Sequence, residues 1–220
     1  MVLTTLQKKP CSKPVFLVSL PPEITQQLFP GKRVYPENRN NPFNGMITII
    51  SGTNRPDSRS RILAEIYAAL LRERQIEHTI LDLAELPIDF TVTALYDNSG
   101  KNENFNQLAN FVSSSEKFVF IVSEYNGSFP GVLKAFIDGL AYPNSFLHKK
   151  GALVGISSGT QGGLLAMSHL TDVLNYLGMH VLASKVRIPQ IEKHLDENQM
   201  GLSDFYLTLL SQQIDQLVAF

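Results

Sequence analysis

The sequence predicts an α/β fold, a three-layer sandwich in which a five-stranded parallel sheet carries helices on both faces. Short apolar runs alternate five times with longer segments whose apolar residues recur every three or four positions, as in buried strands and amphipathic helices. The runs at 118–122 and 152–156 contain almost only apolar residues, which is typical of parallel strands covered on both sides. Alternating strands and helices imply a parallel sheet with right-handed crossovers.

The elements follow one another with few interruptions. Strands are expected at 47–50, 77–83, 117–123, 152–157 and 180–183. The first helix begins after Ser58, a suitable N-cap, and further helices are expected at 103–115, 132–140, 164–177 and 203–217. Residues 84–102 are rich in turn formers and are expected to be irregular. Five such strands commonly take the order 2-1-3-4-5, with the ligand between strands 1 and 3.

Residues 1–45 differ in composition from the rest. They hold seven of the twelve prolines, and six basic against two acidic residues, whereas the remainder holds 13 basic and 18 acidic residues. Such a segment does not form a packed core alone. We therefore predict a Pro-rich N-terminal extension at 1–45 and one folded domain at 46–220. The extension is either a dispensable leader, with Met46 as the native start, or an arm that packs on a partner subunit.

Composition excludes several classes of function. The formal net charge of −1 gives no reason to expect nucleic acid or an acidic membrane surface as a partner. Cys11 is the single cysteine, so no internal disulfide forms and a cytoplasmic location is favoured. No apolar run approaches transmembrane length, and the five histidines lack the spacing of metal ligands, so neither a membrane span nor a metal site is expected.

Three loops rich in glycine and hydroxyl groups follow strands 1, 3 and 4. In the order 2-1-3-4-5 these strands are neighbours, and their carboxyl ends share one edge of the sheet. The loops are therefore expected to converge on one crevice.

The first loop has the chemistry of an anion site. It offers the hydroxyls of Thr53, Ser58 and Ser60, the guanidinium of Arg55, and free N–H groups at a helix N-terminus. Guanidinium and phosphate form strong bidentate pairs, so a phosphate is the expected ligand. The loop is neither a Walker A loop nor a Gly-x-Gly-x-x-Gly fingerprint. A plain turn with an N-cap is the alternative.

The other two loops suit a flat ligand. Tyr125 can place its ring beside another ring, and Asn126-Gly127 can present backbone groups closely, although Asn-Gly is also an ordinary turn sequence. Residues 157–163 contain three glycines, as expected of a backbone that approaches a ligand closely; a flexible loop is the alternative.

Together the loops resemble the NADPH-dependent FMN reductase family, which holds flavodoxin-like quinone, azo-dye and chromate reductases. The resemblance spans about residues 46–183 and rests on Gly-Thr-x-Arg-x-x-Ser at 52–58 and Glu-Tyr-Asn-Gly-Ser-x-Pro-Gly at 124–131. It implies a flavodoxin-like fold, a non-covalent FMN, and NADPH or NADH as hydride donor. It also implies a small acceptor, such as a quinone, azo compound, free flavin or metal oxyanion, and a homodimer or homotetramer.

The match also implies residue roles. The phosphate would be held by Thr53, Arg55, Ser58 and Ser60, and the ring region would be formed by Glu124, Tyr125, Asn126, Gly127, Ser158 and Gly159. The family usually has Ser at the position of Thr53, often Asn at that of Ser60, and Pro at that of Ser123. No catalytic side chain is predicted, because a flavin carries the redox chemistry itself.

The sequence also fits two other functions. Gly155-x-Ser157-x-Gly159 matches the nucleophile elbow of serine hydrolases, which would require a later acid and histidine. The candidates for these two roles are Asp172 or Asp196 and His180 or His194. A non-enzymatic electron carrier or flavin sensor is a further alternative.

Lys134 is expected to pair with Asp138 along a helix. Residues 148–150 are either a solvated loop or a site for the extra phosphate of NADPH.

Overall fold

The structure, a computed structural model, describes residue 43, residues 45–196 and residues 201–220. The predicted extension at 1–45 therefore lies almost wholly outside the described residues. Among the helices of the described part, none is long and apolar enough to cross a membrane.

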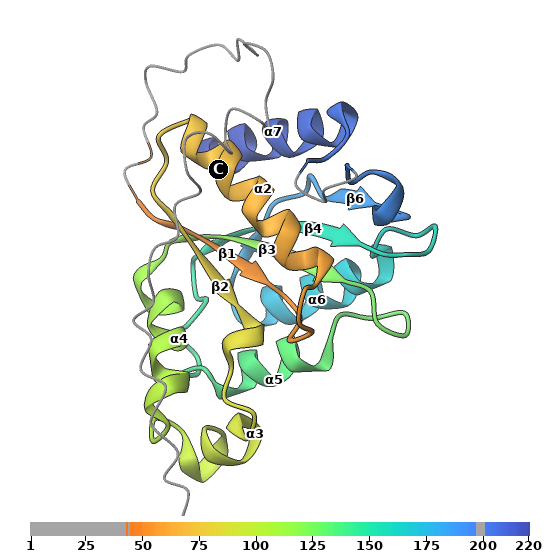
Figure 1. Cartoon of the computed structure of the whole chain (residues 1–220). Helices are drawn as coiled ribbons and strands as arrows, with labels where there is room; N and C mark the ends of the chain where they lie inside the picture. The colour runs from red at the N-terminus through yellow and green to blue at the C-terminus, as the bar shows by residue number, and fades with distance from the viewer. Residues whose placement is uncertain (1–42, 44, 197–200) are drawn as a thin grey trace, which may run out of the picture. The chain divides into compact units, whose positions relative to one another are not determined.

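The centre of the molecule is a parallel sheet of six strands. They are β1 (Ile47–Ser51), β2 (His78–Asp82), β3 (Lys117–Ser123), β4 (Lys150–Ile156), β5 (His180–Val181) and β6 (Val186–Ile188). The order is β2-β1-β3-β4-β5, with β6 also paired to β4, so the predicted order 2-1-3-4-5 is confirmed (Figure 1).

The prediction of a single fifth strand at 180–183 is wrong in detail. β5 pairs with the amino end of β4, where His180 lies opposite Lys150, and β6 pairs with its carboxyl end, where Ile188 lies opposite Ile156. The position of a fifth strand is thus shared by two short strands. A three-residue strand such as β6 is too short to show an alternating pattern in the sequence.

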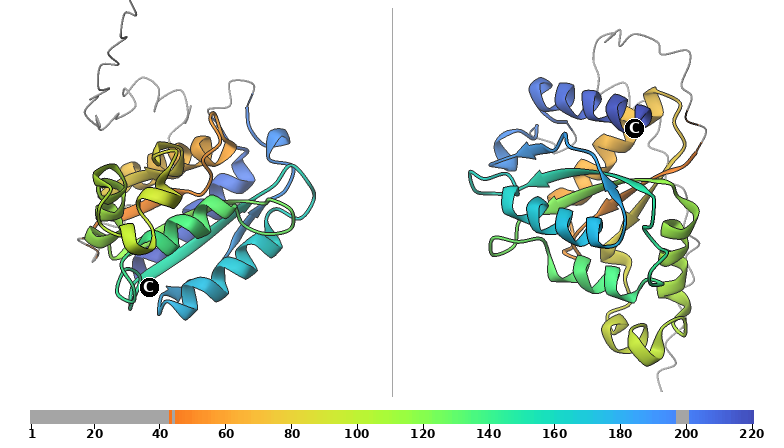
Figure 2. Two further views of the ribbon diagram at one scale, coloured as in Figure 1. Left: turned by 90° about the horizontal axis from the view of Figure 1, so that it is seen from below. Right: turned by 180° about the vertical axis from the view of Figure 1, so that it is seen from behind.

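Helices cover both faces of the sheet. α2 (Arg59–Glu73) and α7 (Asp204–Ala219) lie on one face, and α4 (Glu103–Ser114), α5 (Gly131–Gly139) and α6 (Leu164–Tyr176) lie on the other (Figure 2). Residues 84–102, expected to be irregular, contain the short helix α3 (Phe90–Thr93), the 3₁₀ turn Tyr96–Asn98 and most of the 3₁₀ turn Leu83–Glu85. A third 3₁₀ turn, Ile191–Lys193, precedes α7.

Side chains of β3 alternate between the two faces, and both faces are buried. Phe118 and Phe120 pack against Phe146, with ring centroids 5.5 and 6.0 Å apart. Val119 and Ile121 are also fully buried and, by the alternation of a strand, belong to the opposite face. Coverage on both sides explains why this strand is apolar throughout.

Lys117 joins the start of β3 to the end of α7. Its side chain is buried, and Nζ donates hydrogen bonds to the carbonyls of Leu217 (3.0 Å) and Val218 (2.7 Å). These carbonyls belong to the last turn of a helix, where intrahelical partners are missing. Burial lowers the pKa of Lys117, and the two carbonyls offset part of the cost of placing a charge there.

We expect Lys117→Met to lower the free energy of unfolding by about 1–2 kcal/mol, because it leaves two helix carbonyls without their donor. Urea unfolding followed by circular dichroism measures the change. Lys101→Met, at an exposed lysine, is the control and should change stability little. Equal stability of the Lys117 variant and the wild type would show that α7 does not depend on this contact.

Candidate functional site

The three loops meet at the carboxyl edge of the sheet, as predicted. Ser51 at the end of β1 lies opposite Ile121 of β3, and Ser123 lies opposite Ile156 at the end of β4. Gly52 continues this pairing by donating a hydrogen bond to the Ile121 carbonyl at 3.0 Å. A Cβ at Gly52 would lie 2.7 Å from that oxygen, so the first loop requires glycine here.

The first loop presents a cation before the N-terminus of α2. Ser58 is the N-cap, as predicted, and its Oγ accepts a hydrogen bond from the Arg61 N–H at 3.2 Å. Arg55 is exposed, and among the described residues its guanidinium forms neither a hydrogen bond nor an ion pair. An available guanidinium beside the positive end of a helix dipole is suited to a phosphate.

Two hydroxyl pairs tie the first loop region to the segment after β3. Thr53 Oγ1 lies 2.7 Å from the Tyr125 hydroxyl, and Ser60 Oγ lies 2.7 Å from Ser123 Oγ. Thr53 and Ser60 are buried, whereas their partners Tyr125 and Ser123 are partly exposed, so both hydrogen bonds are partly buried. The expected phosphate residues and ring residues are therefore brought together in one cluster.

Ser60 and Ser123, the two positions where the resemblance described above leads one to expect Asn and Pro, lie in contact in the structure. Proline at position 123 would have no hydroxyl to offer to position 60. Because a buried hydroxyl without a partner is costly, the serine pair satisfies both side chains. The sequence had shown the two departures separately but not that they meet.

Residues 125–128 form a tight turn. The Tyr125 N–H donates to the Ser128 carbonyl at 2.8 Å, and the Ser128 N–H donates to the Tyr125 carbonyl at 3.0 Å. Asn126 and Gly127 at its centre have φ of 51° and 75°. Two consecutive positive φ values are typical of a type I′ turn, for which Asn-Gly is the preferred sequence. Ser128 Oγ lies 3.0 Å from His169 Nδ1, which connects the turn to α6.

Glu124 connects the second and third loops. Its carboxylate accepts a hydrogen bond from the N–H of Gly163, the residue that precedes α6, at 3.2 Å. Its own N–H donates to the Ile156 carbonyl at 3.0 Å. A carboxylate at a helix N-terminus is favoured by the helix dipole. Glu124 therefore holds the loop in which Ser158 and Gly159 lie.

The third loop also depends on Gly155, inside β4. A Cβ on Gly155 would lie 2.4 Å from the Gly162 carbonyl and 2.8 Å from Met167 Cε. The loop thus folds directly back onto the strand that precedes it. In the sequence, Gly155 is noticeable as part of the hydrolase pattern, but a glycine inside a strand also indicates close approach of another backbone.

The geometry does not support the hydrolase alternative. Ser157 Oγ donates to the Gly159 carbonyl and accepts from the Gly162 N–H, both at 2.9 Å, so it stabilises its own loop. His180 lies opposite Lys150, at the other end of β4. The ring of His194 packs edge-on against Tyr206, 4.7 Å between centroids. Among the described residues, no histidine bonds to Ser157.

Lys134 and the basic segment at 148–150 both lie outside the three loops. Lys134 pairs with Asp138, with Nζ 2.7 Å from Oδ1, as predicted. Residues 148–150 lie before and at the start of β4, at the end of the sheet opposite the three loops. Lys149 Nζ donates to the Val112 carbonyl at 2.6 Å, and Lys150 Nζ to the Phe220 carbonyl. This segment is therefore not placed to meet a ligand of the loops.

We expect the Thr53–Tyr125 hydrogen bond to contribute about 0.5–1.5 kcal/mol to stability. Thr53→Val and Tyr125→Phe each remove one of the two hydroxyls while keeping the shape of the side chain. A double-mutant cycle from urea unfolding isolates the pairwise energy. If the two single effects simply add in the double variant, the 2.7 Å contact does not couple the two loops.

Known proteins share this architecture and sequence. The family model for NADPH-dependent FMN reductase matches residues 46–193. A 2-hydroxy-1,4-benzoquinone reductase from Burkholderia sp. is 28% identical over 178 residues, covering 79% of this chain and 94% of the relative. An NADPH azoreductase from Bacillus sp. (strain OY1-2) is 26% identical over 160 residues, covering 70% and 82%.

Among solved structures, the flavoenzyme NAD(P)H:acceptor oxidoreductase FerB from Paracoccus denitrificans has the same fold, with a TM-score of 0.65 at 24% identity. The alignment covers 80% of this chain and 96% of FerB. The family match takes in the whole sheet and all three loops. The chain therefore belongs to the NADPH-dependent FMN reductase family of oxidoreductases.

Proposed function

We propose that this chain passes hydride from NAD(P)H through a bound FMN to a small acceptor such as a quinone, an azo compound, a free flavin or a metal oxyanion. The observation that carries the proposal is the arrangement of the three loops. Arg55, whose side chain has no partner among the described residues, precedes a helix N-terminus. A hydrogen bond joins its loop to the tight turn at Tyr125, and Glu124 beside that turn accepts a hydrogen bond from the glycine-rich loop.

The first loop fits a phosphate. Arg55 supplies the guanidinium, and Ser58 keeps its O–H available because its oxygen accepts the capping hydrogen bond. Thr53 is buried and would have to become accessible; it can then donate to the same phosphate when Tyr125 donates to Thr53. Ser60 is fully buried against Ser123 and would have to turn away from it to reach the phosphate.

The other loops fit a flat ring. A Cβ on Gly159 would meet nothing within 4 Å, and one on Gly127 would meet only Leu165 Cδ1 at 4.0 Å. The backbone at both positions is thus open to a ligand. Tyr125, Asn126 and Ser158 would border the ring, while Glu124 would act by holding the third loop in place.

Bound FMN would supply the chemistry of accepting and delivering a hydride. The residues of the chain would bind its phosphate, orient its ring and leave one face open to the two substrates in turn. The similarity to a benzoquinone reductase and an azoreductase supports a small, electron-poor acceptor.

Steady-state kinetics of the FMN-loaded protein test this function. We expect oxidation of NADPH or NADH in the presence of a benzoquinone, with the parallel double-reciprocal lines of a mechanism in which the two substrates use one site in turn. Bound FMN without any NAD(P)H oxidation would instead indicate an electron carrier or a sensor.

We further propose that the protein is cytoplasmic and works as a homodimer or homotetramer. The resemblance to the family supports the assembly, and the exposed tyrosines 142 and 176 on the α5–α6 side offer an apolar surface for it. Light scattering on the purified chain measures the mass, and a monomer at micromolar concentration would contradict the assembly.

A further inference from the structure

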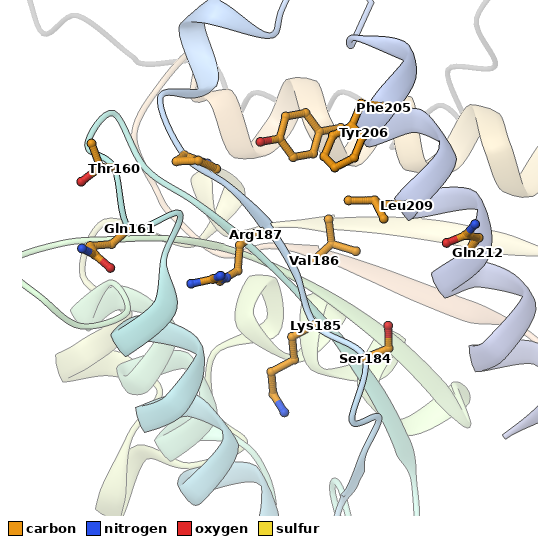
Figure 3. Close-up of a pocket in the computed structure, with 11 residues that line it drawn as sticks. Thr160, Gln161, Ser184, Lys185, Val186, Arg187, Phe205, Tyr206, Leu209 and Gln212 are labelled. Carbon is orange, nitrogen blue, oxygen red and sulfur yellow. The ribbon is translucent and has the colours of Figure 1, made fainter.

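A cavity lies on the side of the third loop away from the predicted flavin ring. It has a volume of about 380 Å³ and runs along β6, between the third loop and α7 (Figure 3). Its lining is formed by Thr160, Gln161, Ser184, Lys185, Val186, Arg187, Pro189, Phe205, Tyr206, Leu209 and Gln212. The function described above uses none of these residues.

The cavity is positively charged. Lys185 and Arg187 are two residues apart in and next to β6, so their side chains leave the same side of the strand, as Figure 3 shows. Within the part of the chain that the structure describes, neither side chain forms a hydrogen bond or an ion pair. The lining contains no carboxylate, although the whole chain has a net charge of −1. This combination favours an anionic ligand.

One wall of the cavity is apolar and aromatic. Phe205 is 66% exposed, and it lies with Val186 and Leu209 on the side of the cavity near α7. An exposed aromatic ring can stack on a nucleobase. Hydroxyl and amide groups of Thr160 and Gln161 complete the opposite side. The two cations leave β6 on the other side from Phe205, so a ligand that spans both sides of the strand would meet a cation pair and a stacking surface, which suits a phosphorylated nucleoside.

The cavity is next to the predicted flavin ring. Arg187 lies opposite Gly155 in the sheet, and a Cβ on Gly162 would lie 3.1 Å from Arg187 Cβ. The Gly159 carbonyl accepts a hydrogen bond from the Gln190 N–H at 2.9 Å, so the third loop packs on the segment after β6. One loop thus borders both the ring region and the cavity.

We propose that this cavity holds the adenosine half of NADPH, with its 2′-phosphate at Lys185 and Arg187. The proposal rests on the proposed function, because it requires the nicotinamide end to reach the flavin on the other side of the third loop. It assigns the preference for NADPH over NADH to two residues outside the family motifs at 52–58 and 124–131.

Calorimetric titration of the FMN-loaded protein with adenosine 2′,5′-bisphosphate tests the proposal without catalysis. Adenosine 5′-monophosphate, which lacks the 2′-phosphate, is the comparison ligand. We expect the bisphosphate to bind more tightly than the monophosphate. Arg187→Gln and Lys185→Gln should each weaken binding of the bisphosphate by about tenfold or more, because each removes one charge-assisted contact. The affinity for the monophosphate should change much less. Lys101→Gln, which removes a distant exposed charge, should change neither.

The same variants are then compared in turnover. The KM for NADPH should rise while the KM for NADH and the affinity for FMN stay at the wild-type values. Equal affinities of the wild type for the two adenosine ligands would overturn the proposal, as would unchanged bisphosphate affinity in both variants. Failure of the proposed function is a separate result, since it appears as absent FMN binding or absent NAD(P)H oxidation in the wild type.

Discussion

Gly155→Ala is expected to destabilise the protein by about 2–3 kcal/mol, because the new methyl group would overlap backbone that has no room to retreat. The Gly162 carbonyl lies 2.4 Å from the position of that Cβ, and Met167 lies on its other side. Relief of the overlap requires the third loop to move away from β4. We therefore also expect weaker FMN binding in this variant.

Urea unfolding of the protein without FMN measures the change in the free energy of unfolding, and flavin fluorescence titration measures the change in FMN affinity. Gly131→Ala is the matched control, since a Cβ at Gly131 meets nothing within 4 Å, and it should change stability by less than about 0.5 kcal/mol. Wild-type stability in Gly155→Ala would mean that the third loop does not pack on β4 as described.

Arg55→Ala is expected to weaken FMN binding by about 1.5–3 kcal/mol, the value of a hydrogen bond to a charged group, and to leave the fold intact. The side chain is exposed and has no protein partner among the described residues, so nothing in the folded chain depends on it. Quenching of FMN fluorescence measures the affinity, and thermal unfolding without FMN checks the fold.

Arg61→Ala provides the comparison for Arg55. Arg61 also lies near the start of α2, but its guanidinium is paired with Glu65 at 2.5 Å and with Asp82 at 3.4 Å. A general effect of positive charge would weaken FMN binding in both variants. A direct contact with the phosphate would weaken it in Arg55→Ala alone, and unchanged affinity in that variant would show that the phosphate lies elsewhere.

The features predicted correctly from the sequence depend on local chemistry. The apolar run of β3 follows from burial on both faces, and the Ser58 cap follows from the unpaired N–H groups of a helix start. The strand order follows from the repeated alternation of strands and helices, and it brings the three loops together. These patterns are contained in neighbouring residues of the chain.

The features that were missed depend on contacts between distant residues. Ser60 and Ser123 are 63 positions apart, and nothing in either segment shows that their hydroxyls meet at 2.7 Å. Position 155 must be glycine because the Gly162 carbonyl, at the far end of the third loop, packs directly against it. β6 has three residues, too few for a periodic pattern, yet it contains Arg187, which lines the cavity beside the third loop.

The central claim is that the three loops form one FMN site, and the visible spectrum of the purified protein tests it most directly. The protein is titrated with FMN, freed of unbound flavin, and then mixed with NADPH without oxygen. We expect one FMN per chain, with the absorption bands of a bound flavin that bleach when NADPH is added. A protein that retains no flavin after saturation with FMN would contradict the account.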